Sequence, residues 1–294
     1  MKVARLVGPR RFEFLETDTP TPEDGQCLIK LEQLSICGSD IHREYGRLFP
    51  EDHYPVRIGD PCHECAGVVV ESRCEEFREG QRVIVYPGLG RPGGLVEYIA
   101  SEPRMMCALP DEGDLGEWVM CQPSGTVLYA CQKMGSLLGK SVAIVGQGAI
   151  GLSFSMITSS LGAAQVIGID PLDYRLDWSK DVGATHTINP DRDEVVQAVQ
   201  DITEGRGPDI VVEAVGFPDP LNMALRLVRQ FGTVIVFGIQ SQKMVPIDHE
   251  LLMERQPTII TTRGGFAQDP IAPIRTMVDL KQRGIIDPGK LVTH

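Results

Sequence analysis

The sequence lacks the features that mark nucleic-acid-binding, exported and membrane-spanning proteins. Its 294 residues carry 28 Lys and Arg against 40 Asp and Glu, a formal net charge of −12, and such a surface repels phosphate backbones. The N-terminal stretch MKVARLVGPRRFEF has no apolar core of a secretory signal. No run approaches the ~20 apolar residues that a membrane helix needs. We therefore expect a cytoplasmic protein that binds neither nucleic acid nor a membrane.

The eight cysteines lack the regular spacing of a disulfide framework, and without an export signal we expect them to be reduced. The stretch DPCHECAG, residues 60–67, places Cys62, His63, Glu64 and Cys65 side by side. All four side chains can ligate a metal, but four neighbours cannot all point at one ion. A C-x-x-C pair fits half of a zinc site, a redox couple or neither, so this stretch alone leaves the choice open.

The pattern of the chain changes near Pro123. Before it, short β-branched runs bounded by Gly or Pro predict a mostly antiparallel β domain. After it, strand-like and helix-like segments alternate, which predicts a parallel sheet covered by helices on both faces. The strands expected in the first part are 26–36, 65–72, 81–87 and 95–100. The strands expected in the second part are 141–146, 165–170, 186–189, 209–216, 233–238 and 258–263, with helices at 149–161, 172–182, 191–204, 219–230 and 248–254.

A glycine loop follows the first strand of this alternating part. In SVAIVGQGAIGLSF, Gly146, Gly148 and Gly151 have the G-x-G-x-x-G spacing that lets a backbone approach a pyrophosphate at a helix N-terminus. Asp170 ends the next strand, at close to the ~20 residues expected after the loop, where a carboxylate accepts hydrogen bonds from the adenosine ribose. This carboxylate would repel a 2′-phosphate, so we expect NAD, although Arg175 nearby leaves NADP open.

Eight stretches in order carry a resemblance over essentially the whole chain. They are ICGSDIH, HECAGVVVE, GQRVIVYP, GGLVEYIA, IVGQGAIGL, GIDPLDYRLDWSKDVGAT, GPDIVVEAVG and GTVIVFG. The chain resembles the zinc-dependent medium-chain dehydrogenases, the family of alcohol, polyol, glucose and threonine dehydrogenases. The resemblance implies an α/β protein with a GroES-like catalytic domain at 1–122 and a doubly wound Rossmann domain at 123–284. Residues 285–294 would return towards the catalytic domain, which looks shorter than in relatives, and the active site would lie in the cleft between the domains.

The resemblance assigns Cys37 and His63 as ligands of a catalytic zinc. The family's third ligand is a Cys or a Glu, and Gln122 stands at that position here, as in some sugar dehydrogenases that pair it with the Glu after the His. We therefore expect Cys37, His63, Glu64 and Gln122 to hold the ion. Cys121 remains an alternative ligand, and Fe²⁺ or Co²⁺ would also suit this set.

The resemblance also gives roles to neighbouring residues. Asp40 is expected to hydrogen-bond a ligating His, and Ser39 and His42 to carry the alcohol's proton away. Cys62 stands where the family usually has Gly, and neither Cys62 nor Cys65 is expected to bind the ion, although a redox couple stays open. The expected contacts of the cofactor are Gly146, Gly148, Ala149, Ile150, Gly151, Asp170, Arg175, Gly216, Phe237 and Gly238.

The expected reaction is hydride transfer between NAD and a secondary alcohol, polyol- or sugar-like, with a small molecule as substrate. Two alternatives are a zinc-free quinone or enone reductase of the same fold and a non-catalytic dinucleotide-binding sensor. The cysteine-rich lobe that holds a structural zinc in many members is missing after GQRVIVYP, so one zinc is expected. The apolar, β-branched TIITTRG, 258–264, predicts a sheet edge that pairs with another subunit in a homodimer or homotetramer.

Overall fold

The computed structural model describes residues 1–41, 51–87, 92–263 and 268–293. Contacts divide the chain into two compact units. The first unit combines residues 1–125 with 265–294, and the second spans 126–264. The sequence predicted a first domain at 1–122, a second at 123–284, and a return of 285–294 towards the first. The contacts instead group the segment after residue 264 with the first unit.

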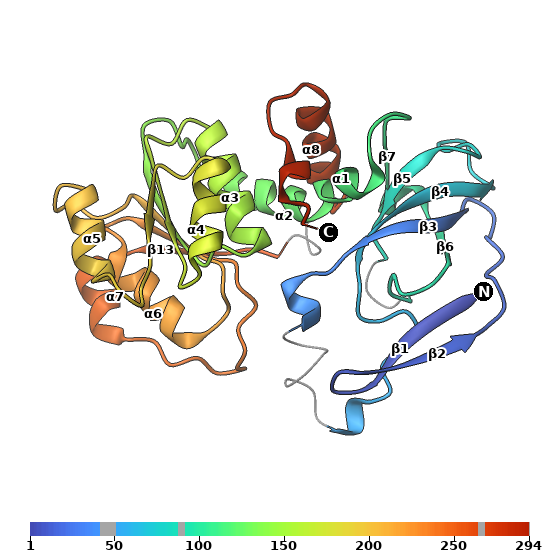
Figure 1. Cartoon of the computed structure of the whole chain (residues 1–294), viewed down its shortest axis with the longest axis horizontal. Coiled ribbons are helices and arrows are strands. Elements are labelled where there is room, and N and C mark those ends of the chain that lie inside the picture. The colour runs from blue at the N-terminus through green and yellow to red at the C-terminus, as the bar shows by residue number, and fades with distance from the viewer. Residues whose placement is uncertain (42–50, 88–91, 264–267, 294) are drawn as a thin grey trace. The chain divides into compact units, whose positions relative to one another are not determined.

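An antiparallel sheet forms the frame of the first unit, with its strands in the order β6-β3-β4-β5-β7 (Figure 1). In the central pair, β3 and β4, Ser35 lies opposite Glu64 at one end and Cys27 opposite Ser72 at the other. Apolar side chains from these strands form a buried core. The strands are β1 (Lys2–Gly8), β2 (Arg11–Glu16), β3 (Cys27–Ser35), β4 (Glu64–Ser72), β5 (Arg82–Val85), β6 (Tyr98–Ser101) and β7 (Met106–Ala108).

Helices complete the first unit: α1 (Leu115–Val119), α2 (Cys121–Gln132), which runs on into the second unit, and α8 (Ala272–Gln282), with short 3-10 turns at Glu51–His53, Pro103–Met105 and Pro288–Leu291.

Lys281 of α8 connects distant parts of the chain. Its ammonium contacts Glu117 at 3.2 Å, forms an ion pair with Asp287 and lies 5.1 Å from the ring centre of Trp118. The Lys281 side chain is only 9% exposed, so these contacts satisfy a nearly buried charge.

The second unit is a parallel sheet in the order β10-β9-β8-β11-β12-β13, the doubly wound order. Figure 1 shows α3 and α4 on one face and α5, α6 and α7 on the other. The strands are β8 (Ser141–Val145), β9 (Gln165–Ile169), β10 (His186–Ile188), β11 (Ile210–Glu213), β12 (Thr233–Val236) and β13 (Thr258–Thr261). The helices are α3 (Ala149–Ser160), α4 (Asp173–Asp181), α5 (Val195–Ile202), α6 (Pro218–Leu227) and α7 (His249–Arg255).

These two units confirm the expected fold class, a mostly antiparallel β domain and a doubly wound parallel sheet. The sequence pattern did not predict the β1–β2 hairpin, α2 or α8. Strand β13 lies at the edge of its sheet, and Ile259 on it is 42% exposed. Among the described residues no helix is both long and apolar enough to cross a membrane.

Candidate functional site

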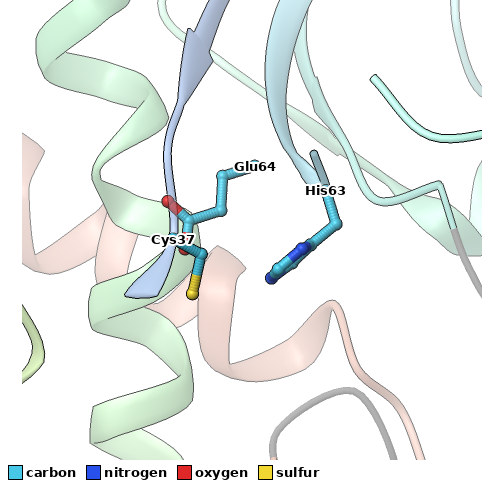
Figure 2. A group of neighbouring side chains, drawn as sticks. All are labelled: Cys37, His63 and Glu64. Atoms are coloured by element: carbon cyan, nitrogen blue, oxygen red, sulfur yellow. The ribbon is translucent and has the colours of Figure 1, made fainter. Parts of the chain in front are cut away.

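The residues predicted to bind a metal meet at one end of the β3–β4 pair. Cys37 lies two residues beyond β3, and His63 and Glu64 lie where β4 begins. One potential ligand atom from each of these three side chains falls within 4.8 Å of the others. Figure 2 shows the Cys37 sulfur and the His63 ring directed into the same space, with Glu64 beside Cys37. The structure therefore gathers three of the four predicted ligands into one cluster.

The start of β4 explains how the neighbours His63 and Glu64 reach the same place. Successive side chains within a strand point to opposite faces, but His63 precedes the first strand residue and is free of that alternation. Cys62, just before it, turns the chain with a φ of 44°, in the left-handed region. The side chains of Cys62 and Cys65 are 2% and 0% exposed and pack in the apolar core.

Asp40 contacts two of the clustered residues, Cys37 and His63. Its carboxylate, 3% exposed, accepts a hydrogen bond from the Cys37 backbone N–H at 2.9 Å and lies 3.2 Å from His63 Nδ1. A carboxylate at Nδ1 fixes the orientation of an imidazole and leaves Nε2 to bind a metal. This is the contact that the sequence predicted for Asp40.

The charges of the cluster call for a cation. Burial raises the pKa of Cys37, and the nearby Glu64 raises it further, while His63 and a hydrogen bond from Ser39 oppose the shift. Burial also raises the pKa of Glu64. For His63, burial lowers the pKa, but hydrogen bonds and charges from Asp40 and Cys37 outweigh it and raise the pKa to about 12.

Gln122, the fourth predicted ligand, lies on α2 and is buried. The side chain is 3% exposed, and its Oε1 has no hydrogen-bond partner among the residues that the structure describes. A buried amide oxygen without a partner is costly, and a cation would satisfy it. Thiolate, imidazole and oxygen donors suit zinc, and a catalytic zinc keeps one position open when three of them bind it. Cys121 does not join the cluster within the described part of the chain, and burial raises its pKa to about 12.

The two predicted proton carriers differ in what the structure shows. Ser39 is partly exposed and its side chain hydrogen-bonds Cys37. It therefore stands beside the cluster. His42 lies outside the described residues.

The glycine loop of the second unit has the geometry that its spacing predicts. Gly146 has a φ of 93°, and Gly148 is the N-cap of α3, so Ala149 is the first helical residue and its turn includes Ile150. A side chain at Gly151 would overlap the carbonyl oxygen of Gly146. Glycine at these positions keeps the backbone close to the helix N-terminus, where a pyrophosphate binds.

Asp170 follows β9 and is 3% exposed. Its carboxylate accepts hydrogen bonds from the backbone N–H groups of Gln147 at 2.8 Å and Leu172 at 2.9 Å. Arg175 Nη1 lies 3.4 Å from the same carboxylate. Asp170 therefore ties the glycine loop to the start of α4.

The other predicted cofactor contacts lie at the carboxyl ends of β11 and β12. Gly216 has a φ of 91°, and Gly238 comes so close to Gly216 that a side chain there would overlap its nitrogen. Phe237 packs edge-on against Phe154 of α3, with ring centres 5.2 Å apart. In open α/β sheets, ligands bind at this edge of the strands.

Sequence reasoning missed two buried polar residues that hold this edge. Glu213 is fully buried and accepts hydrogen bonds from the N–H groups of Val215 and Gly216, both at 2.7 Å, and from Gln240 Nε2 at 3.0 Å. An acidic residue at the end of the apolar run DIVVE was the available signal. Gln147, also fully buried, accepts hydrogen bonds at Oε1 from the hydroxyls of Ser155 and Ser179. Gln147 lies between two glycines, where nothing in the pattern marks it.

Comparisons with known proteins agree with both units. The family profile for the alcohol dehydrogenase GroES-like domain matches residues 23–139, and that for zinc-binding dehydrogenase matches residues 149–281. The chain belongs to the zinc-dependent medium-chain dehydrogenase family. A family member of similar sequence is the sorbitol dehydrogenase of Bacillus subtilis strain 168, 28% identical over 324 residues, which covers 100% of this chain and 89% of that protein.

Two solved structures of dehydrogenases resemble the chain over nearly its whole length. One is an Escherichia coli oxidoreductase of unknown specificity, with a TM-score of 0.88 and 27% identity, covering 100% of this chain and 91% of that one. The other is a zinc-binding dehydrogenase of Sinorhizobium meliloti 1021 bound to NADP, with a TM-score of 0.84 and 25% identity, covering 97% and 89%. These likenesses confirm the family and the fold.

Proposed function

We propose that the chain is a zinc-dependent dehydrogenase that transfers hydride between NAD and a secondary alcohol of a polyol or sugar. The observation that carries the proposal is the cluster of Cys37, His63 and Glu64, with Asp40 at His63 Nδ1. The sorbitol dehydrogenase relative supports the class of substrate. A dinucleotide sensor would have no use for a thiolate, an imidazole and a carboxylate gathered in this way.

In this proposal, Cys37, His63, Glu64 and Gln122 would hold one zinc ion. Bound zinc would lower the pKa of the substrate alcohol and stabilise negative charge on its oxygen. Asp40 keeps His63 in the tautomer that offers Nε2. Ser39, which hydrogen-bonds Cys37, would receive the hydroxyl proton, and His42 is the residue that the resemblance offers to take it on to water. Bound NAD would supply the nicotinamide that accepts the hydride from the alcohol carbon.

The preference for NAD follows from Asp170. Its carboxylate is held by two backbone N–H groups, so it cannot swing away from a 2′-phosphate without breaking them. Arg175 could attract that phosphate, but its guanidinium already faces Asp170. We propose that these contacts favour a free ribose 2′-hydroxyl.

We also propose that the protein is a homodimer or homotetramer that pairs through β13. The strand lies at the edge of its sheet, and Thr258, Ile259 and Thr261 on it are exposed. An open edge of β-branched residues invites a second strand. Light scattering that gives a stable monomer of 32.3 kDa would contradict this assembly.

The test of the function combines metal analysis with a substrate panel. Purified protein is assayed for zinc and for NADH formation with polyols, sugars and simple secondary alcohols, and for NADPH oxidation with enones and quinones. We expect one zinc per chain and NADH formation with polyols or sugars. Enone reduction by zinc-free protein would instead identify a reductase, and inactivity with intact dinucleotide binding would identify a sensor.

A further inference from the structure

Two neighbouring cysteines lie at one end of strands β3 and β4, opposite the end that carries Cys37, His63 and Glu64. Cys27 is the first residue of β3 and faces Ser72, the last residue of β4, while Cys74 follows two residues later. The sulfur atoms of Cys27 and Cys74 are 3.3 Å apart. A disulfide bond is about 2.05 Å long, so these sulfurs need to move little to form one.

The two thiols differ in access to solvent. Cys27 is 0% exposed, and burial raises its pKa to about 11. Cys74 is partly exposed and lines a surface hollow with Arg73, Glu75 and Arg104. A small oxidant can therefore reach Cys74 first, with Cys27 directly behind it.

The side chain of Ser72 supports both sulfurs. Its Oγ lies 3.5 Å from the Cys27 sulfur and 3.7 Å from the Cys74 sulfur, and it donates a hydrogen bond to the carbonyl oxygen of Phe77 at 2.6 Å. This hydroxyl accepts a hydrogen bond from the Cys27 thiol and donates its own hydrogen to the Phe77 carbonyl oxygen. Ser72, at the end of β4, thus contacts both Cys27 on β3 and Cys74 in the bend that follows β4.

The remaining cysteines, all within the described part of the chain, do not offer the same arrangement. Cys37 belongs to the metal cluster. Cys62 and Cys65 contact each other, but both are buried in the core. The other three are also buried: Cys107, Cys121 and Cys131. Only the pair of Cys27 and Cys74 combines two neighbouring sulfurs with a route to solvent.

We propose that Cys27 and Cys74 form a site of reversible disulfide formation that responds to hydroperoxides. The Cys74 sulfur attacks the O–O bond of ROOH, which gives a sulfenic acid on Cys74 and releases ROH. The Cys27 sulfur then displaces the hydroxyl of the sulfenic acid, the S–S bond forms, and water leaves. Two thiols lose two electrons and two protons, and the hydroperoxide is reduced to ROH and water.

The bond would close a loop that contains Cys37, His63 and Glu64. It would fasten the β3–β4 pair at the end away from these residues, so the arrangement of the metal ligands need not change. A cross-link constrains the unfolded chain, so the oxidised protein should unfold at a higher temperature than the reduced protein. We therefore expect oxidation of Cys27 and Cys74 to raise the thermal stability of the first unit and to leave Cys37, a predicted metal ligand, as a free thiol.

The experiment treats zinc-loaded protein with one equivalent of hydrogen peroxide, alkylates the remaining thiols after denaturation and maps tryptic peptides without reduction. Cys27 falls in the peptide 12–30 and Cys74 in 74–78, whereas Cys62 and Cys65 share 58–73. We expect 12–30 linked to 74–78, two hydrogens lighter than their sum and separated by dithiothreitol. Free thiols should fall from the eight of the sequence by two.

Two variants complete the test. Cys74→Ser should abolish the link, leave Cys27 alkylated and remove the peroxide-dependent rise in unfolding temperature. Cys131→Ala, which removes a buried thiol away from the pair, should keep both. The proposal is overturned if 58–73 acquires an internal disulfide at a lower peroxide dose. It is equally overturned if Cys74 is recovered as a sulfinic or sulfonic acid while Cys27 stays a free thiol.

Discussion

Glu64 in the first unit and Asp170 in the second are both 3% exposed, yet their surroundings differ. Asp170 receives two backbone N–H groups and faces a guanidinium, all supplied by the chain. Glu64 lies beside a thiol and near the carboxylate of Asp40, and burial raises its pKa. The two carboxylates are therefore equally buried but have different partners.

The same difference extends to the regions around these residues. The glycine loop is complete before a cofactor arrives, since Asp170, Gln147 and Glu213 already have hydrogen-bond donors. Among the described residues, the Gln122 amide oxygen has no hydrogen-bond partner, and Asp40 and Cys37 raise the pKa of His63 to about 12 against the effect of burial. We therefore expect substitutions around Cys37, His63 and Glu64 to act through metal binding. Substitutions around the glycine loop should act through dinucleotide binding.

The largest expected effect comes from removing a ligand. His63→Ala or Cys37→Ala should lower kcat/KM by about 10³-fold or more, because bound zinc supplies several kcal/mol of charge stabilisation. Zinc content should fall, while NADH binding, measured by fluorescence titration, should stay unchanged. Cys62→Ser and Cys65→Ser are the matched controls and should keep most of the zinc and activity. Loss of zinc in these controls, with retention in His63→Ala, would show that the ion has other ligands.

Zinc binding should depend steeply on pH. His63 must lose its proton and Cys37 must become a thiolate, so about two protons should leave per zinc and affinity should rise up to ~100-fold per pH unit. Calorimetry in buffers of different ionisation enthalpy measures the proton count. Binding without proton release would contradict the assignment of Cys37 and His63.

The free energy of unfolding of the metal-free protein should fall as the pH rises, whereas zinc affinity should increase. The pKa of His63 in the folded protein, about 12, lies above the ordinary 6.5, so its contribution is full below about pH 6.5 and is lost as the pH rises towards 12. Denaturant unfolding of metal-free protein between pH 6.5 and 10 measures this loss. The zinc-loaded protein should not show it.

A smaller effect is expected at the glycine loop. Asp170→Ala should narrow the preference for NAD over NADP by roughly 10- to 100-fold, equivalent to about 1–3 kcal/mol of repulsion from a 2′-phosphate. The ratio of kcat/KM for the two cofactors measures it, with zinc content as the control. A wild-type enzyme that uses NADP at least as well as NAD would refute the preference.

The smallest effect should come from Gln122. A neutral amide oxygen binds zinc more weakly than a thiolate, so Gln122→Ala should weaken zinc retention by about 10-fold, within the range for residues that support a metal site. Gln122→Glu should be tolerated, because Glu fills this position in polyol dehydrogenases that the sequence resembles. Competition with a chelator compares the variants, and an unchanged affinity in Gln122→Ala would exclude Gln122 from the ligands.

Sequence patterns predicted the second unit more fully than the first. Buried parallel strands and regular helices leave strong periodic signals, and each predicted strand there has a counterpart. Helix α2 was missed because it contains Gly125, a poor helix former. A side chain at Gly125 would lie 2.9 Å from the backbone of Ile274 in α8, so close packing with a distant helix requires the glycine.

Sequence patterns were also insufficient to predict the whole candidate site. The resemblance predicted four ligands, three of which the structure brings together, but the residues alone could not decide among Cys62, His63, Glu64 and Cys65. That choice depends on β4 beginning at Glu64 and on the turn at Cys62, which are set by pairing with β3. The buried hydrogen bonds of Gln147 and Glu213 likewise join segments that lie far apart in the sequence.

The contacts of Lys281 have a consequence for synthesis on the ribosome. Glu117 and Trp118 are made early, but their partner arrives only after the whole second unit has been translated. At about 5–20 residues per second, the segment from 126 to 281 takes roughly 10–30 s to emerge. During that time the second unit can fold while the first still lacks α8. We therefore expect the nascent first unit to complete its fold only after residues 265–294 have been synthesised.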